Sequence, residues 1–276
     1  MYDTLIEPKV LLDHIGESRW RTIDCRASLL DLDFGRSAYI ANHIPGAVFG
    51  DLVTDFSGPL IRGVTGRHPL PDAAILSTTF GQWGITGDSQ VVTYDAGNGA
   101  FAARAWWLLR WLGHARVAVL NGGMDAWQSA GYAVRSGIET QPARQFTIAP
   151  TLTRTVSAPD ILARHTAMEL LDARSEVRFR GEIEPIDPVA GHIPGARCLP
   201  FEGNLDARNR FMEPAVLRDR FAASASSGRE VVSYCGSGVT ACHNIVAMKH
   251  AGLPEPSLYP GSFSEWIQDP QRPVER

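Results

Sequence analysis

The sequence repeats itself once, and this repeat limits the possible folds more than any other feature of the chain. The pentapeptide HIPGA at 43–47 returns at 192–196. The apolar segment VVTYD at 91–95 returns as VVSYC at 231–235. A D-x-R triplet precedes each HIPGA, and a G-x-x-x-x-W segment follows each V-V-x-Y. Because these landmarks occur in the same order in both copies, they indicate a duplicated domain.

Each copy alternates short apolar segments with helical segments. Runs that are short and rich in β-branched residues are expected as buried strands, at 21–24, 91–94, 117–120, 169–172 and 231–234. Helices are expected at 101–112, closed by Gly113, and at 240–250, closed by Gly252. This alternation predicts an α/β fold of two tandem domains, each with a mainly parallel sheet flanked by helices.

A segment without hydrophobic periodicity separates the two copies. Residues 137–160 contain three prolines among threonine, serine and glutamine, which is typical of a connecting segment. We therefore predict an N-terminal domain at 1–138, a linker at 139–158 and a C-terminal domain at 159–276.

The composition is that of an ordinary globular chain and argues against several functions. The 276 residues are 44% hydrophobic and 20% charged, which is enough for two cores. The net charge of −4 without a basic block argues against nucleic acid as a partner. No signal peptide and no run of roughly 18 apolar residues is found, so no membrane association is expected. The four cysteines contain no C-x-x-C pair, which favours a reduced, cytoplasmic protein.

The two copies differ in chemistry at the end of one predicted strand. The second copy has Cys235 there, followed by the loop GSGVT at 236–240 and a helix. Glycines in such a loop allow successive amides to point inward, and the helix N-terminus adds partial positive charge. A thiol in this setting is expected to ionise readily, and the thiolate is its reactive form. The first copy has Asp95 at this point, so we expect its domain to be non-catalytic.

The sequence lacks the residues that a dinucleotide site or a metal site requires. Both loops resemble a dinucleotide fingerprint, but Asn121 and Tyr259 stand where that fingerprint requires an acid. Cys235, Cys242 and His243 lack the spacing of metal ligands. We therefore expect neither a metal nor an organic cofactor.

These residues carry a family resemblance that covers nearly the whole chain. Both HIPGA motifs, both D-x-R triplets and both G-x-x-x-x-W segments resemble those of the tandem-domain rhodanese-like sulfurtransferases. The loop CGSGVT at 235–240 is similar to that of the 3-mercaptopyruvate sulfurtransferases. The resemblance implies two rhodanese-like domains and a catalytic Cys235 that alternates between thiolate and persulfide. It further implies that 3-mercaptopyruvate donates the sulfur and leaves as pyruvate. The implied acceptor is cyanide or a thiol, either small or on a thioredoxin-like protein.

The resemblance also implies roles for residues around this cysteine. Arg178 matches the arginine that binds the carboxylate of the donor, and Ser237 is expected to pass a proton to the enolate of the leaving pyruvate. The remaining loop residues are expected to bind the substrate, through Gly236, Gly238, Val239 and Thr240.

His43 of the first HIPGA motif is a further candidate for substrate binding, if it reaches a cleft between the domains. Its counterpart His192 occupies the identical motif in the second copy. Both histidines are therefore also open to a structural role in the same turn.

The residue at position 187 leaves the identity of the sulfur donor open. The 3-mercaptopyruvate enzymes usually carry a second arginine where this chain has Asp187, and thiosulfate sulfurtransferases resemble the chain at this point. Thiosulfate enzymes, however, more often place basic residues in the cysteine loop, which CGSGVT lacks. The sequence thus favours 3-mercaptopyruvate and keeps thiosulfate as an alternative. A non-catalytic binding or sensor protein with a rhodanese fold is the third hypothesis.

Overall fold

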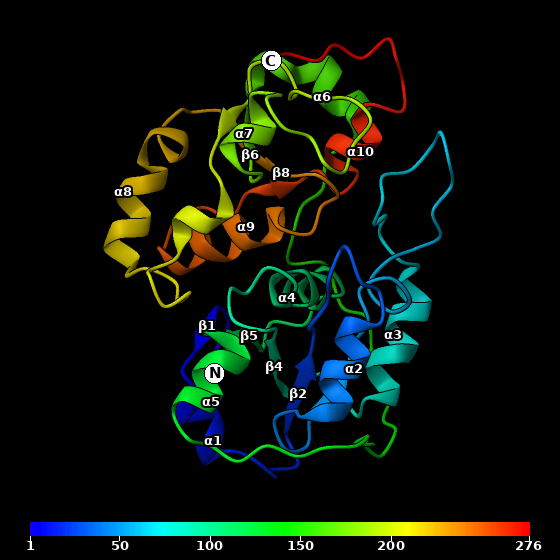
Figure 1. Ribbon diagram of the computed structural model, residues 1–276, viewed down its shortest axis with the longest axis vertical. Helices are drawn as coiled ribbons and strands as arrows, with labels where there is room; N and C mark the ends of the chain where they lie inside the picture. Colours follow the sequence, from blue (N-terminus) through cyan, green and yellow to red (C-terminus); the bar gives the residue numbers. More distant parts are fainter. The chain divides into compact units, whose positions relative to one another are not determined.

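The computed structural model describes residues 1–276, and their contacts divide the chain into two compact units (Figure 1). Unit 1 consists of Met1–Gly58, Pro71–Leu152 and Ala207–Arg210. Unit 2 consists of Pro59–Leu70, Thr153–Asp206 and Phe211–Arg276. The main division, between Leu152 and Thr153, lies inside the stretch that the sequence predicts as the linker.

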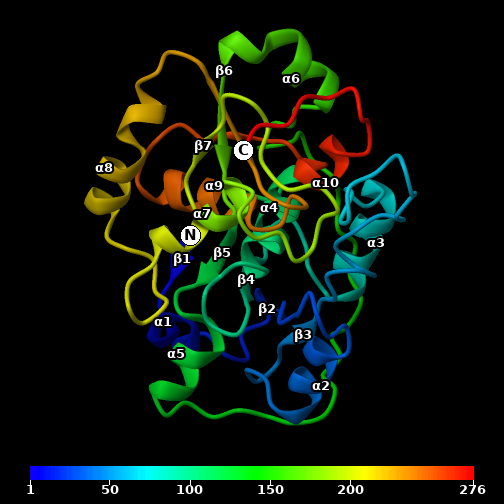
Figure 2. The ribbon, with the colours of Figure 1, turned by 45° about the horizontal axis from the view of Figure 1, so that its top comes forward.

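Unit 1 is built around a parallel sheet with the strand order β1-β5-β4-β2-β3 (Figure 2). Its strands are β1 (Leu5–Ile6), β2 (Trp20–Asp24), β3 (Val48–Phe49), β4 (Gln90–Tyr94) and β5 (Val117–Leu120). Its helices are α1 (Pro8–Asp13), α2 (Phe34–Ala41), α3 (Ala73–Gln82), α4 (Ala102–Trp111) and α5 (Gly123–Ser129). All residues of β4 and β5 are buried, as expected for central strands of a sheet covered by helices.

Unit 2 has a parallel sheet with the order β7-β6-β8-β9, which corresponds to β3-β2-β4-β5 of unit 1. Its strands are β6 (Met168–Asp172), β7 (Arg197–Cys198), β8 (Glu230–Tyr234) and β9 (Ser257–Leu258). Its α-helices are α6 (Ala158–Arg164), α7 (Glu176–Phe179), α8 (Pro214–Ala225), α9 (Ala241–His250) and α10 (Ser262–Trp266). Two 3₁₀ helices complete it, η1 (His165–Ala167) and η2 (Phe201–Asn204). None of the helices in either unit has the length and apolar composition of a membrane span.

The predicted fold class is confirmed, and the predicted longer elements lie within one or two residues of the observed ones. The helices expected at 101–112 and 240–250 are α4 and α9. Gly113 and Gly252 follow them with φ angles of +85° and +74°, the left-handed conformation that glycine adopts after a helix. Four strands were not predicted, β1, β3, β7 and β9, because two residues are too few to show a hydrophobic period.

Each unit has its own hydrophobic core, and the repeated tryptophans belong to these cores. The core of unit 1 includes Ile6, Val92, Tyr94, Leu120 and Trp127. The core of unit 2 includes Leu170, Val232, Tyr234, Phe263 and Trp266. Trp127 and Trp266 end the two G-x-x-x-x-W segments, so packing accounts for this part of the repeat.

In each D-x-R triplet, the aspartate at the end of a central strand forms buried hydrogen bonds with the arginine two residues later. Asp24 accepts hydrogen bonds from Arg26 Nη2 at 2.6 Å and from the Tyr94 hydroxyl at 2.7 Å, and all three side chains are buried. Asp172 accepts from Arg174 Nη2 at 2.6 Å in unit 2. Burial, reinforced by the charge of Asp24, raises the pKa of Tyr94, so this hydroxyl stays a neutral donor.

Replacing Asp24 tests this arrangement. We expect Asp24→Ala to lower the free energy of unfolding by about 3 to 5 kcal/mol, because it leaves the Arg26 guanidinium buried without its carboxylate. Asp13→Ala is the control, since Asp13 forms an exposed pair with Lys9 that contributes little. Urea unfolding measures both variants. Similar stabilities for the two would show that the Asp24–Arg26 pair has no structural importance.

Candidate active site

Residues 59–70 come from the first repeat but pack within unit 2, beside α10 (Figures 1 and 2). Gly66 lies so close to the start of α10 that an added Cβ would be 2.4 Å from the carbonyl oxygen of Gly261. The amide of Arg67 donates to Ser264 Oγ at 3.0 Å. These contacts bring Arg67 and His68 to the same unit as Cys235.

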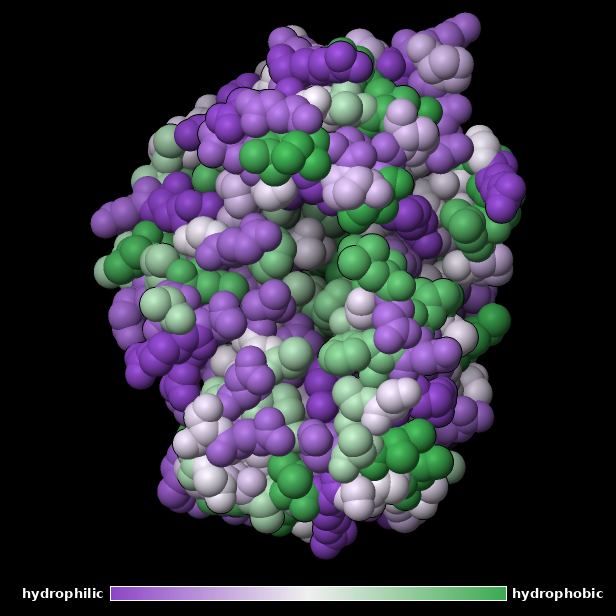
Figure 3. Space-filling view, in the orientation of Figure 1, coloured by the Kyte–Doolittle hydropathy of each residue, from purple (hydrophilic) through white to green (hydrophobic).

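The outer part of this segment is exposed. Its apolar residues Leu60, Ile61 and Val64 are all more than half exposed. The face drawn in Figure 3 shows green, apolar residues at the surface among purple, hydrophilic ones.

Cys235 follows β8 at the carboxyl end of the sheet, where the chain order reverses between β6 and β8. Such a point is where parallel sheets place ligands. The Gly238 amide donates to Cys235 Sγ at 3.2 Å. Gly238 has a φ of +76°, and an added Cβ would lie 2.3 Å from the Pro260 carbonyl oxygen, so glycine is required there. An N–H group, rather than a carbonyl, therefore faces the sulfur.

The carbonyls of the loop are bound elsewhere. The amide of Phe263 donates to the Cys235 carbonyl at 3.0 Å, and the amide of Ser264 donates to the Gly236 carbonyl at 2.9 Å. Cys242 Sγ donates to the Gly238 carbonyl at 3.4 Å. Hydrogen bonds from α10 and α9 thus fix these three carbonyls, and with them the backbone of the loop.

The first repeat shows what this kind of loop binds. The carboxylate of Asp95 accepts hydrogen bonds from four backbone amides, at 2.9 to 3.2 Å, those of Gly97, Gly99, Phe101 and Ala102. Gly99 has a φ of +76°, as Gly238 has in unit 2. The loop of unit 1 thus binds its own carboxylate through several amides. At the equivalent position in unit 2, the sulfur of Cys235 accepts from one amide, that of Gly238.

Ser262 is a site residue that the sequence analysis missed. Its φ of +53° is rare for a residue other than glycine, and Gly123 has the same φ at the matching place in unit 1. Ser262 Oγ accepts from the amide of Cys235 at 3.1 Å and donates to the Tyr259 carbonyl at 2.9 Å. The difference between the repeats that points to Ser262 is the change from GG at 122–123 to GS at 261–262.

Ser237 lies beside His68, which the sequence analysis also missed. His68 Nδ1 and Ser237 Oγ are 2.8 Å apart, and the two residues are 8% and 4% exposed. They are separated by 169 positions, so no local pattern could pair them. A hydroxyl next to an imidazole can exchange a proton with it.

Arg178 lies near the loop but is already bound by two carboxylates. An added Cβ on Gly236 would be 3.6 Å from Arg178 Nη2. The same nitrogen donates to Glu184 Oε1 at 2.7 Å and to Asp187 Oδ2 at 3.0 Å. Although burial acts to raise it, hydrogen bonds from Arg178 hold the pKa of Glu184 below its ordinary value. Arg67, which was not predicted, binds the other oxygen of Asp187.

The remaining predicted residues have simpler surroundings. Val239 is buried, and Thr240 directly precedes α9. His43 lies in unit 1 with its ring stacked on Tyr39, and its Nδ1 is 2.8 Å from the Tyr39 carbonyl oxygen. His192 makes the same contacts with Phe179 in unit 2. These contacts match the structural role that the sequence left open for both histidines.

The other three cysteines lie in surroundings less suited to a nucleophile. Burial raises the pKa of Cys25 well above its ordinary value. Burial, together with the charge of Asp172, raises the pKa of Cys198 to about 11. These two thiols therefore stay protonated near neutral pH, and Cys242 is fully buried in α9.

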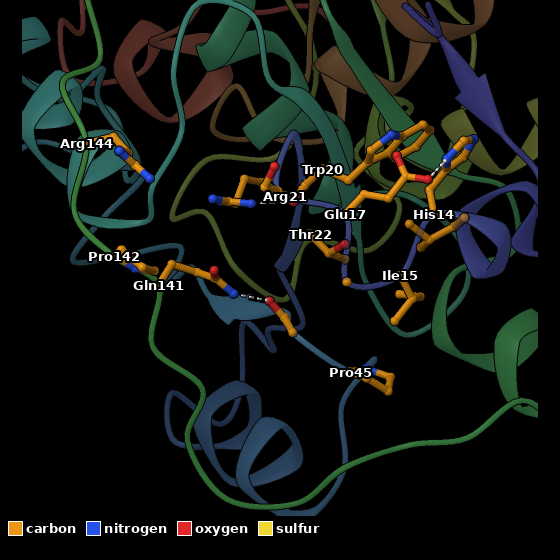
Figure 4. A pocket seen from close by; sticks show the side chains of 14 residues that line it. His14, Ile15, Glu17, Trp20, Arg21, Thr22, Pro45, Gln141, Pro142 and Arg144 are labelled. Carbon is orange, nitrogen blue, oxygen red and sulfur yellow. Dashed lines mark hydrogen bonds and ion pairs between the residues drawn. The ribbon is translucent and has the colours of Figure 1, made fainter.

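A pocket in unit 1 has a different character (Figure 4). Its volume is about 280 Å³, and no cysteine lines it. His14 stacks on Trp20 and binds Glu17 at 2.8 Å. The guanidinium groups of Arg21 and Arg144 point toward each other, and burial together with the charge of Arg144 lowers the pKa of Arg21. The pocket carries positive charge but no group suited to sulfur chemistry.

Comparison with known proteins agrees with this architecture. The model of the rhodanese-like domain family matches residues 7–130 and 157–269. The chain belongs to the rhodanese-like family. A Pseudomonas aeruginosa protein named as a probable 3-mercaptopyruvate sulfurtransferase is 50% identical over 98% of this chain and 97% of its own length.

Two further relatives extend the comparison. A Mycobacterium tuberculosis protein provisionally named a thiosulfate sulfurtransferase is 40% identical over 95% of this chain and 90% of its own. The structure of 3-mercaptopyruvate sulfurtransferase from Leishmania major superposes with a TM-score of 0.83 at 32% identity, covering 96% of this chain and 74% of that one. These names agree with the enzyme class, a sulfurtransferase, that the sequence predicts, and the predicted family is confirmed.

The strained backbone of Ser262 yields a stability test. We expect Ser262→Gly to be more stable than Ser262→Ala by about 1 kcal/mol, because glycine adopts a positive φ without a steric penalty. Both variants lose the hydroxyl that accepts from the Cys235 amide, so the comparison isolates the backbone. Thermal or urea unfolding gives the difference. An alanine variant as stable as the glycine variant would mean that this φ is not imposed by the fold.

Proposed function

We propose that this chain transfers sulfur from 3-mercaptopyruvate to a thiophilic acceptor, with Cys235 as nucleophile. The observation that carries the proposal is the amide of Gly238 directed at Cys235 Sγ, in a loop whose counterpart in unit 1 binds a carboxylate. Amides that stabilise an anion favour the thiolate before the reaction and the anionic persulfide after it.

The proposed reaction proceeds in two steps. The Cys235 thiolate attacks the sulfur of 3-mercaptopyruvate, so that a sulfur–sulfur bond forms and the carbon–sulfur bond breaks. The electron pair of the broken bond stays on the pyruvate enolate, which takes up a proton at carbon. The acceptor thiolate or cyanide then attacks the outer sulfur of the persulfide and regenerates the Cys235 thiolate. A covalent intermediate divides one difficult transfer into two easier ones.

Ser237 is the proposed proton donor to the enolate, and His68 is its positioning residue. The contact of 2.8 Å between Nδ1 and Oγ supports this role, since the imidazole can return a proton to the hydroxyl. Gly236, Gly238, Val239 and Thr240 form the proposed binding loop. His43 contacts Tyr39 within unit 1, and these contacts give no support for a part in substrate binding.

Thiosulfate remains a second candidate donor. Asp187 takes the place of an arginine that is usual in 3-mercaptopyruvate enzymes, and the relative from M. tuberculosis carries the thiosulfate name. Thiosulfate would leave sulfite, an anion that needs no proton. The ratio of kcat/KM for the two donors, measured side by side, decides between them.

We further propose a thiol acceptor, either small or on a thioredoxin-like protein, and a cytoplasmic location. All four cysteines are free, which suits a reducing compartment where thiol acceptors are abundant. We assign the nucleophile and the proton donor to the C-terminal domain, residues 159–276. The N-terminal domain at 1–138 has no nucleophile of its own, but its residues 59–70 pack within unit 2 and supply His68.

The nucleophile is tested by Cys235→Ser. We expect this variant to lose turnover with every sulfur donor, because a hydroxyl cannot carry the persulfide. Incubating the unmodified protein with donor alone should add about 32 mass units, one sulfur atom, to the peptide containing Cys235. Cys198→Ser, a control at a half-buried thiol, should keep both activity and mass shift. An unmodified Cys235 peptide would support the non-catalytic sensor hypothesis instead.

The proton donor is tested with both sulfur donors. Ser237→Ala should lower kcat for 3-mercaptopyruvate by roughly 100-fold, the usual contribution of a proton transfer, and leave thiosulfate turnover nearly unchanged. His68→Ala should lower kcat for 3-mercaptopyruvate by a smaller factor than Ser237→Ala, because Ser237 remains. It should also alter the pH profile of kcat. Equal losses with both donors would indicate that Ser237 only supports the shape of the loop.

A further inference from the structure

We propose that the pocket of unit 1 beside Arg21 is a binding site for a small oxyanion, held by the guanidinium groups of Arg21 and Arg144. The ligand class is a phosphate, a sulfate or the carboxylate of a small molecule, since a guanidinium binds each of these through paired N–H groups. The pocket belongs to the unit without Cys235, so this inference goes beyond the proposed function and does not depend on it.

The pocket is formed by three separate parts of unit 1. Arg21 is the second residue of β2, His14 and Glu17 follow α1, and Arg144 comes from the segment that the sequence predicts as the linker. The volume of about 280 Å³ is just below the usual range of small-molecule sites, roughly 300 to 1,000 Å³. This size restricts the ligand to a small molecule or an ion.

Arg21 is half-buried and is held in place by backbone carbonyls rather than by an acid. Its Nε donates to the Gly84 carbonyl at 3.1 Å, and its Nη1 donates to the Trp20 carbonyl at 2.7 Å. Gly84 has a φ of +71°, and an added Cβ would lie 3.0 Å from Arg21 Nε and 3.3 Å from Nη2. Glycine at this position therefore lets the turn after α3 approach the guanidinium and fix its orientation.

Arg144 is positioned by its backbone, and its side chain is exposed. The amide of Arg144 donates to the Gly81 carbonyl at 2.8 Å, and an added Cβ on Gly81 would be 2.6 Å from the Arg144 carbonyl oxygen. The Arg144 guanidinium points toward that of Arg21 (Figure 4). Burial and the charge of Arg144 lower the pKa of Arg21, with no carboxylate acting against them. An anion between the two groups would relieve this repulsion.

The one acid that lines the pocket is already paired. Glu17 Oε1 lies 2.8 Å from His14 Nδ1, and the His14 ring stacks on Trp20 with ring centroids 4.0 Å apart. Figure 4 shows these three side chains to the right of the two guanidinium groups. Unit 1 thus supplies no counter-ion for Arg21 and Arg144, and the pocket is open to an anion.

The repeat shows that the unpaired charge of Arg21 is specific to unit 1. The strands β2 and β6 each have five residues, and the second residue is Arg21 in β2 and Glu169 in β6. The Glu169 side chain is 3% exposed and pairs with Arg197 and Arg229 of its own unit. Unit 2 therefore neutralises the charge at this position internally, whereas unit 1 has a cation there without an internal acid.

The test follows the indole N–H signal of Trp20, which lines the pocket, in protein labelled with nitrogen-15. The chain has seven tryptophans, so Trp20→Phe assigns this signal. We expect inorganic phosphate to shift the signal saturably. Arg144→Gln should weaken the affinity about 10- to 100-fold, through the loss of one charge-assisted contact. Arg116→Gln is the matched control, an exposed arginine of unit 1 outside the pocket, and should keep the affinity.

Further measurements separate binding from a structural role. Arg144→Gln should unfold at the same temperature as the unmodified protein without phosphate, and phosphate should raise its Tm less than that of Arg116→Gln. Arg144→Lys, which keeps the charge without the planar fork, should recover part of the affinity. A Trp20 signal that moves equally in Arg144→Gln and Arg116→Gln would overturn the proposal.

Titrations with sulfate and acetate identify the class of oxyanion. Tighter binding of phosphate and sulfate supports a tetrahedral ligand, and tighter binding of acetate supports a carboxylate. A Trp20 signal that does not shift with any of the three probes would overturn the site. No turnover is measured in these experiments, so their failure leaves the Cys235 persulfide to its own test.

Discussion

The loop that follows a central strand, with backbone amides directed at the side chain that begins it, is the constraint on which the active site depends. In unit 1 four amides bind the Asp95 carboxylate, and in unit 2 the amide of Gly238 binds the sulfur of Cys235. The position of the cysteine loop is also fixed by α10, because amides at the start of this helix bind the carbonyls of Cys235 and Gly236. A thiol held this way is placed for chemistry by the fold itself, before any substrate binds.

The surroundings of the cysteine are organised by charge. Asp187 binds two arginines through separate oxygens, Arg67 through Oδ1 and Arg178 through Oδ2, so its negative charge is paired within unit 2. Burial raises the pKa of Asp187, against the charges of Arg67 and Arg178. The acid that looks unfavourable in the sequence therefore acts, in the structure, as the support of the cation beside the loop.

The duplication separates residues of the fold from residues of the chemistry. Positions that match between the repeats are structural: the D-x-R triplets, the core tryptophans, and the paired His43 and His192. Positions that differ cluster around the sulfur, as with Asp95 against Cys235 and Gly123 against Ser262. His43 and His192 belong to the first group, because both make the same contacts.

The sequence by itself determined the family, the α/β class, the longer strands and helices, and the cysteine loop, because each is encoded in a local pattern that the repeat reinforces. It did not reveal that Arg67 and His68 lie beside that loop. Their contacts with Asp187 and Ser237 join positions far apart in the chain, within a segment that has no regular secondary structure. Only the tertiary structure decides such pairings, since they depend on where residues 59–70 pack and not on any local period.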